Sequence, residues 1–73
     1  MSPSHIPSSS GAKVVAALRK VGFEHVRIKG DHAKLRRDSR VVIVPLHKEL
    51  KRGTTVSILK QAGLTADELR KLL

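Results

Sequence analysis

Hydrophobic positions along the chain follow two different periods, and these predict where helices and strands lie. The first stretch has a helical period of about 3.6 residues, which is carried by Val14, Val15, Leu18 and Val21. We therefore expect a helix over residues 11–21. The side chain of Ser9 or Ser10 can cap its start, and Gly22 can end it.

From Phe23 to Val44 the period changes to two, which is typical of strands whose side chains point alternately to opposite faces. Turn signals at residues 30–31 and 38–39 divide this stretch into three strands, and Pro45 ends the third strand. Because the connections are short, we expect the three strands to be antiparallel.

Two further helices are expected after the strands. Thr54 or Thr55 can cap the first of them and Gly63 can end it; its apolar positions are Val56, Ile58, Leu59 and Ala62. Thr65 and Glu68 form a capping box that opens a last short helix. The predicted fold class is α+β, a three-stranded antiparallel sheet with helices packed on one face, in the order α-β-β-β-α-α.

Alternation in the first two strands assigns their side chains to two faces. We expect the helices to cover the apolar face, which carries Val26, Ile28, Ala33 and Leu35. The other face is then open to solvent and carries His25, Arg27, Lys29, His32, Lys34 and Arg36. Charged outer faces also occur on sheets that bind nothing. The absence of an acid among these six residues favours a phosphate-binding surface.

Length and composition limit the 73-residue chain to one domain. Its first ten residues, MSPSHIPSSS, are rich in Ser and Pro and have no apolar period, so we expect a disordered tail over residues 1–10 and a folded domain over residues 11–73. The chain has no cysteine, and disulfides cannot reinforce it. It shows neither a secretory signal nor an apolar run long enough to span a bilayer, which predicts a soluble cytoplasmic protein without a membrane partner.

The chain carries a formal net charge of +9, and this narrows the class of partner. Within residues 25–52, nine Lys and Arg stand against three acids. Such a field attracts phosphate backbones by releasing counterions, although an acidic lipid or an acidic protein could also match it. Phe23 is the only aromatic residue, so stacking platforms for bases are absent and RNA would be held mainly through its phosphates.

Candidate chemistry centres on His32. The sequence has no cysteine nucleophile, no phosphate loop, and no histidine with a closely spaced second ligand, so we expect neither a metal nor another cofactor. RNA supplies its own nucleophile, the 2′-hydroxyl, and histidine can move its proton near neutral pH. Lys and Arg can stabilise the charged phosphorane. The alternative is that His32 is simply an exposed strand residue.

Four short motifs occur in order along the chain. They are Val21-Gly22-Phe23, then Lys29-Gly30-Asp31-His32, then Val44-Pro45-Leu46-His47, and finally Lys51-Arg52-Gly53-Thr54 leading into residues 57–64. Together they resemble the HicA-type (YcfA-like) family of bacterial mRNA-interferase toxins. The resemblance implies a fold like a double-stranded-RNA-binding domain and metal-independent cleavage of mRNA. It also implies a HicB-type antitoxin that covers the active site, and we expect DNA contact only through that antitoxin.

The resemblance also implies roles for individual residues. The family's catalytic histidine corresponds to His32, and nearby basic residues of the family correspond to Arg27 and Lys29. Gly30 and His47 are candidates for supporting the site. For His47, which matches a histidine after Val-Pro, phosphate contact and local structure are both open, with local structure favoured.

Asp31 departs from the family, which usually has a serine at this position. An acid beside the histidine could raise its pKa or repel phosphate and so lower activity. Side chains alternate along a strand, however, and this would point Asp31 away from the substrate. Many members also carry a second histidine where this chain has Ala33.

The sequence therefore predicts a HicA-like ribonuclease toxin with His32 as general acid/base. Arg27, Lys29, Lys34 and Arg36 are its expected RNA-binding partners. A single histidine would have to make both proton transfers, or share them with water or a lysine. Two other functions stay open: a non-catalytic RNA-binding module of the same fold, and a protein-interaction domain whose basic face binds an acidic partner.

Overall fold

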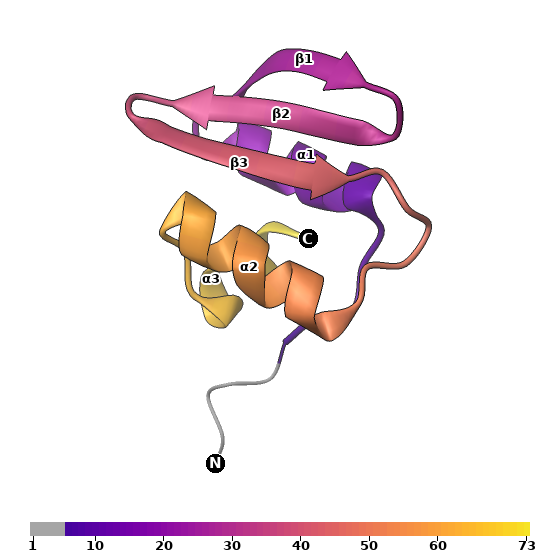
Figure 1. Cartoon of the computed structure of the whole chain (residues 1–73). Helices are drawn as coiled ribbons and strands as arrows, with labels where there is room; N and C mark the ends of the chain where they lie inside the picture. The colour runs from indigo at the N-terminus through magenta and orange to yellow at the C-terminus, as the bar shows by residue number, and fades with distance from the viewer. Residues whose placement is uncertain (1–5) are drawn as a thin grey trace.

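The structure, a computed structural model that describes residues 6–73, is built around one small sheet (Figure 1). In chain order its elements are α1 (Gly11–Lys20), β1 (Glu24–Lys29), β2 (His32–Arg37), β3 (Arg40–Pro45), α2 (Arg52–Ala62) and α3 (Ala66–Leu72). The sheet is antiparallel with the order β1-β2-β3, so β2 is central. These findings confirm the predicted α+β class and element order. Within residues 6–73, no helix is both long enough and apolar enough to cross a membrane.

Local sequence signals set most of the helix ends. Ser10 caps α1, because its side-chain oxygen accepts a hydrogen bond from the backbone N–H of Lys13. Gly63 ends α2 with a left-handed φ of 72°, a conformation that glycine adopts without steric cost. Thr65 and Glu68 form the capping box of α3 in both directions.

The start of α2 differs from the prediction that Thr54 or Thr55 caps this helix. The helix begins at Arg52, and the residue before it, Lys51, makes no side-chain capping hydrogen bond. Thr55 lies one turn inside the helix, where it is buried and its hydroxyl donates to the Lys51 carbonyl oxygen. Because a threonine can satisfy its hydroxyl within a helix, the residue type alone did not mark the N-terminus.

The core lies between the helices and the inner face of β2 and β3. Its fully buried side chains include Val14, Leu18, Phe23, Ala33, Leu35, Val42, Val44, Ile58 and Ala62. Helix α2 packs along β3, α1 crosses the same strand, and α3 packs on α1. The side-chain oxygen of Gln61 also accepts a hydrogen bond from the backbone N–H of Ile43 at 2.9 Å, so α2 covers the outer edge of β3.

The helices leave β1 uncovered, which corrects the prediction that they bury Val26 and Ile28. These side chains are 47% and 58% exposed, and every other residue of β1 is exposed too. The helices pack mainly on β3, and β1 is the strand farthest from β3 in the sheet. Val42 and Val44 complete the apolar face in their place, as partners of the buried residues of β2.

A bulge in β1 changes which side chains share the open face. The register shifts between His25 and Arg27, so His25 pairs with Leu35, whose side chain is buried. Directly opposed residues in an antiparallel pair lie on the same face. His25 is therefore not part of the predicted basic face. Glu24 pairs with Arg36, and the open face does contain an acid.

Residues 6–10, part of the expected tail, contact the folded domain. The backbone N–H of Leu50 donates to the carbonyl of Ser9 at 2.9 Å, and the hydroxyl of Ser8 donates to the carboxylate of Glu49 at 3.2 Å. Pro7 is buried. Residues 1–5 lie outside the described residues, and the division of the chain at residue 10 stays a prediction.

Candidate functional site

The turn between β1 and β2 places Asp31 and His32 at one end of the open face. Gly30 begins this turn with a left-handed φ of 60°. A side chain there would meet nothing within 4 Å, so the backbone conformation and not crowding favours glycine. Asp31 completes the turn, and His32 is the first residue of β2. The chain thus reverses within two residues and presents both side chains near one point.

Two backbone hydrogen bonds fix the segment after β3, one to this turn and one to the start of α1. The N–H of Leu46 donates to the carbonyl of Asp31 at 2.6 Å, and the N–H of Gly11 donates to the carbonyl of His47 at 2.9 Å. Position 11 requires glycine, because a Cβ there would overlap the carbonyl oxygen of Pro45. These contacts use the main chain, so they hold the backbone of His47 beside Asp31 independently of the histidine ring.

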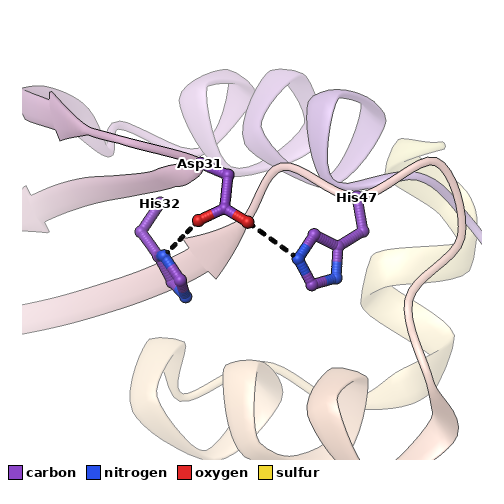
Figure 2. A network of polar contacts seen from close by, with 3 residues as sticks. All are labelled: Asp31, His32 and His47. Atoms are coloured by element: carbon purple, nitrogen blue, oxygen red, sulfur yellow. Dashed lines mark hydrogen bonds and ion pairs between the residues drawn. The ribbon is translucent and has the colours of Figure 1, made fainter.

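Figure 2 shows the Asp31 carboxylate between two histidine rings. Its Oδ1 lies 2.8 Å from Nδ1 of His32, and its Oδ2 lies 3.1 Å from Nε2 of His47. The ring centroids are 6.5 Å apart in an edge-to-face arrangement. The side chains of His32 and His47 are 52% and 55% exposed, so a bound molecule can reach both. Among residues 6–73, no group of three or more His, Cys, Asp or Glu side chains is arranged to hold a metal ion.

Asp31 does not point away from His32, which corrects the prediction from strand alternation. Alternation applies within a strand, and Asp31 lies in the turn, where the turn dihedrals set the side-chain direction. The negative carboxylate 2.8 Å from Nδ1 of His32 favours a proton on that nitrogen, and Nε2 then keeps a free lone pair. The contact therefore selects the tautomer that can accept a proton at Nε2.

The two histidines change the acidity of Asp31. The hydrogen bond from His47 lowers the pKa of the Asp31 carboxyl below its ordinary value of 3.8, and the nearby charge of His32 adds to this effect. Desolvation acts in the opposite direction and is outweighed. Asp31 is therefore ionised at neutral pH. It accepts a hydrogen bond from the ring of His47 and lies in close electrostatic contact with the ring of His32.

We expect the Asp31 carboxyl to titrate below pH 3.8 in the folded chain, and to titrate closer to 3.8 in His47→Ala. Below the ordinary pKa the folded state binds fewer protons than the unfolded state, so this contact stabilises the fold above that pH and is lost as pH falls through the lowered pKa. Carboxyl ¹³C chemical shifts against pH measure the midpoint, with His25→Ala as the control. A midpoint that does not move in His47→Ala would contradict the hydrogen bond.

A hollow of about 330 Å³ on the open face adjoins His32. It is lined by Arg27, Lys29, His32, Ala33, Lys34 and Ile43. Arg27 pairs with Lys34 across the two strands, and Lys29 pairs with His32, so the cations flank the histidine directly. The structure thus brings together four of the five residues predicted for catalysis and RNA binding. Arg36 lies on the same face and outside the lining of the hollow.

Two residues included in the count of positive charge bind the protein itself. Arg37 donates to the carbonyl of Val21 at 2.7 Å, and its guanidinium lies 4.8 Å from the centre of the Phe23 ring. Arg40 donates to the carbonyl of Gln61 at 3.3 Å. The number of Lys and Arg in the sequence therefore overstates the charge available to a ligand on the sheet.

Sequence reasoning missed the contribution of β3 to the open face. Val41 and Ile43 are exposed there, as partners of Arg36 and Lys34. The run of β-branched residues from 41 to 44 hides the alternation, because both faces of the strand are aliphatic. Only the pairing of β3 with β2 shows which of these residues face outward. It adds the aliphatic side chains of Val41 and Ile43 to the basic face.

The family model described as the HicA toxin of bacterial toxin–antitoxin systems matches residues 11–64. This match begins at α1 and extends just past α2, and it includes Asp31, His32 and His47. The chain belongs to the HicA toxin family. The resemblance indicated by the four sequence motifs is confirmed, and this HicA toxin is the toxin of a toxin–antitoxin system, which pairs it with an antitoxin. Comparison with curated proteins gave no match.

Proposed function

We propose that this HicA toxin is a metal-independent endoribonuclease that cleaves mRNA in the cytoplasm, with His32 as general acid/base. The observation that carries the proposal is the 2.8 Å contact between Asp31 and Nδ1 of His32, beside a hollow lined by cations. This contact leaves Nε2 free on a ring that is half exposed. A base on the surface of a positively charged sheet suits a substrate that is a polyanion.

The proposed reaction uses the 2′-hydroxyl of the RNA as its nucleophile. Nε2 of His32 takes the hydroxyl proton, the 2′ oxygen attacks the adjacent phosphorus, and the bond from phosphorus to the 5′ oxygen breaks. The fragments then end in a 2′,3′-cyclic phosphate and a 5′-hydroxyl. Arg27 and Lys29 stabilise the charge that builds on the phosphoryl oxygens. Asp31 stabilises the imidazolium that forms at His32, as a carboxylate partner does in other histidine-based sites.

The proposed RNA-binding residues are Arg27, Lys29, Lys34 and Arg36, which all lie on the open face. Gly30 and His47 support the site through the turn and the segment that packs on it. Phe23 is buried in the core and offers no surface on which a base could stack. Affinity should therefore come mainly from the phosphates, with weak discrimination between sequences.

We expect RNA affinity to fall linearly with salt on logarithmic axes, by roughly 0.7 per phosphate neutralised on a single strand. Lys34→Ala/Arg36→Ala should weaken binding to unrelated sequences and reduce this slope. Lys13→Ala/Lys71→Ala removes two exposed cations from α1 and α3. It has the same net charge as Lys34→Ala/Arg36→Ala and serves as its control. Filter binding across a salt series measures the affinity and the salt slope of each double variant. Equal losses in the two double variants would contradict a binding site on the sheet.

We also propose that the antitoxin is of the HicB type and covers His32 and the adjoining hollow. An acidic surface on the partner would match the cations of the open face. Because a partner that binds only the folded chain stabilises it, the complex should melt at a higher temperature than the toxin. We expect the complex to leave RNA intact under conditions in which the free toxin cleaves it. Equal rates for complex and free toxin would place the catalytic residue elsewhere.

A cleavage assay with purified toxin, with and without a chelator, tests the proposed activity. We expect cleavage of RNA in both conditions. A chain that binds RNA without cutting it would instead be a non-catalytic RNA-binding module of the same fold. A chain that shows no RNA binding in the absence of a protein partner would be an interaction domain whose basic face serves that partner.

A further inference from the structure

The proposed reaction requires two proton transfers, and His32 accounts for the first of them. The departing 5′ oxygen also needs a proton, because an alkoxide is a poor leaving group. A second histidine, His47, belongs to the same polar network and contacts the other oxygen of Asp31 at 3.1 Å. Its ring is 6.5 Å from that of His32 and is accessible to a ligand.

The shared carboxylate orients the two rings in a complementary way. It contacts Nδ1 of His32 and Nε2 of His47, so opposite nitrogens of the two rings remain available. Figure 2 shows these remaining nitrogens on the same side of the carboxylate, the lower side in this view. Proton transfer requires heavy atoms within roughly 3 Å of each other. Two rings whose centroids are 6.5 Å apart can contact one phosphoryl group from two directions.

On the basis of the proposed endoribonuclease activity, we propose that His47 is the second catalytic residue, the general acid that protonates the leaving 5′ oxygen. His32 gains the proton of the 2′-hydroxyl, and His47 gives up a proton from Nδ1. The bond from the 2′ oxygen to phosphorus forms as the bond from phosphorus to the 5′ oxygen breaks. Asp31 is a positioning residue for both rings, and exchange with water returns each histidine to its starting state.

The structure favours this role over a purely structural one. The carbonyl of His47 accepts the hydrogen bond from Gly11, so the backbone and not the ring anchors the segment. Lys29 and Lys34 also line the hollow. An ordinary ammonium group, however, holds its proton more tightly near neutral pH than an imidazolium does. His47 is therefore the better proton donor of the groups around the site.

Two variants of His47 and two substrates test the assignment. His47→Gln keeps an amide donor for Asp31 but cannot transfer a proton, whereas His47→Ala removes both functions. The substrates are an RNA with a mapped cleavage position and the same RNA with sulfur in place of the 5′ bridging oxygen at that position. A thiolate leaves without being protonated, so this second substrate does not need a general acid. His25→Ala is the control for loss of an exposed histidine.

We expect both His47 variants to cleave the ordinary RNA about a hundredfold or more slowly than the parent. Both should cleave the sulfur-containing RNA within a fewfold of the parent rate, whereas His32→Ala should be slow on both substrates. A His47→Gln variant with the parent rate on ordinary RNA would overturn the proposal. Equal losses on the two substrates would also overturn it. A parent chain that cuts neither substrate would overturn the endoribonuclease activity itself.

Discussion

His32→Ala should lose RNA cleavage by about a hundredfold or more while the chain stays folded, since general acid–base catalysis contributes on that scale. The ring lies on the open face at the edge of a turn, and about half of its surface is exposed. Its removal leaves the core intact and should change the free energy of unfolding only slightly. Cleavage rates under single-turnover conditions measure the loss, and thermal unfolding measures the stability.

The matched control for this variant is His25→Ala. His25 is also an exposed histidine of the sheet, but the bulge in β1 pairs it with Leu35 and takes it off the basic face. The His25→Ala variant should cleave RNA at the rate of the parent chain. His32→Ala should still bind RNA and the antitoxin, and its expression should no longer arrest growth. Full activity in His32→Ala would remove His32 from catalysis, and an unfolded variant would show that its role is structural.

The sequence predicted the elements of the fold because their signals are local. The helical period in α1, the turn at Gly30 and the capping box at Thr65 each depend on residues close together in the chain, and the structure confirms all three. Burial on β1 depends on where distant helices pack, and no local pattern of Val26 and Ile28 carries that information.

Alternation also predicted much of the candidate site. It placed Arg27, Lys29, His32 and Lys34 on one face, and the register confirms that these four residues face one another across β1 and β2. The bulge that removes His25 from this face adds one residue to a strand without any distinctive residue type. The alternation of residue types in β1 continues across the bulge, so the sequence gives no sign that the bulge is there.

The network of Asp31 with the two histidines could not be predicted from the sequence. Sixteen positions separate Asp31 from His47, and they meet because the segment after β3 bonds to the turn and to the start of α1. Glycine at position 11 permits the close approach, but this requirement is visible only when the carbonyl of Pro45 is in place. The sequence offered His32 as the candidate for proton transfer, and tertiary contacts bring a second histidine, His47, to the same carboxylate.

Replacing a single 2′-hydroxyl by hydrogen at the cleavage position should abolish scission there. The proposed nucleophile is then missing, so no amount of catalytic assistance from His32 can restore the reaction. The phosphates that we propose to bind at the hollow lined by Arg27, Lys29 and Lys34 are unchanged. The deoxy strand should therefore bind with nearly the affinity of the parent RNA and act as a competitive inhibitor. Competition with labelled RNA measures this affinity.

The most direct test of the central claim is cleavage of this matched pair of strands by the purified toxin in excess chelator, with analysis of the product ends. The all-ribose strand should be cut to a 2′,3′-cyclic phosphate and a 5′-hydroxyl, at the same rate with and without chelator. The strand with one deoxyribose should remain intact at that position. Cleavage of the deoxy position, fragments with 5′-phosphates, or complete loss of activity in chelator would contradict a metal-independent attack by the 2′-hydroxyl.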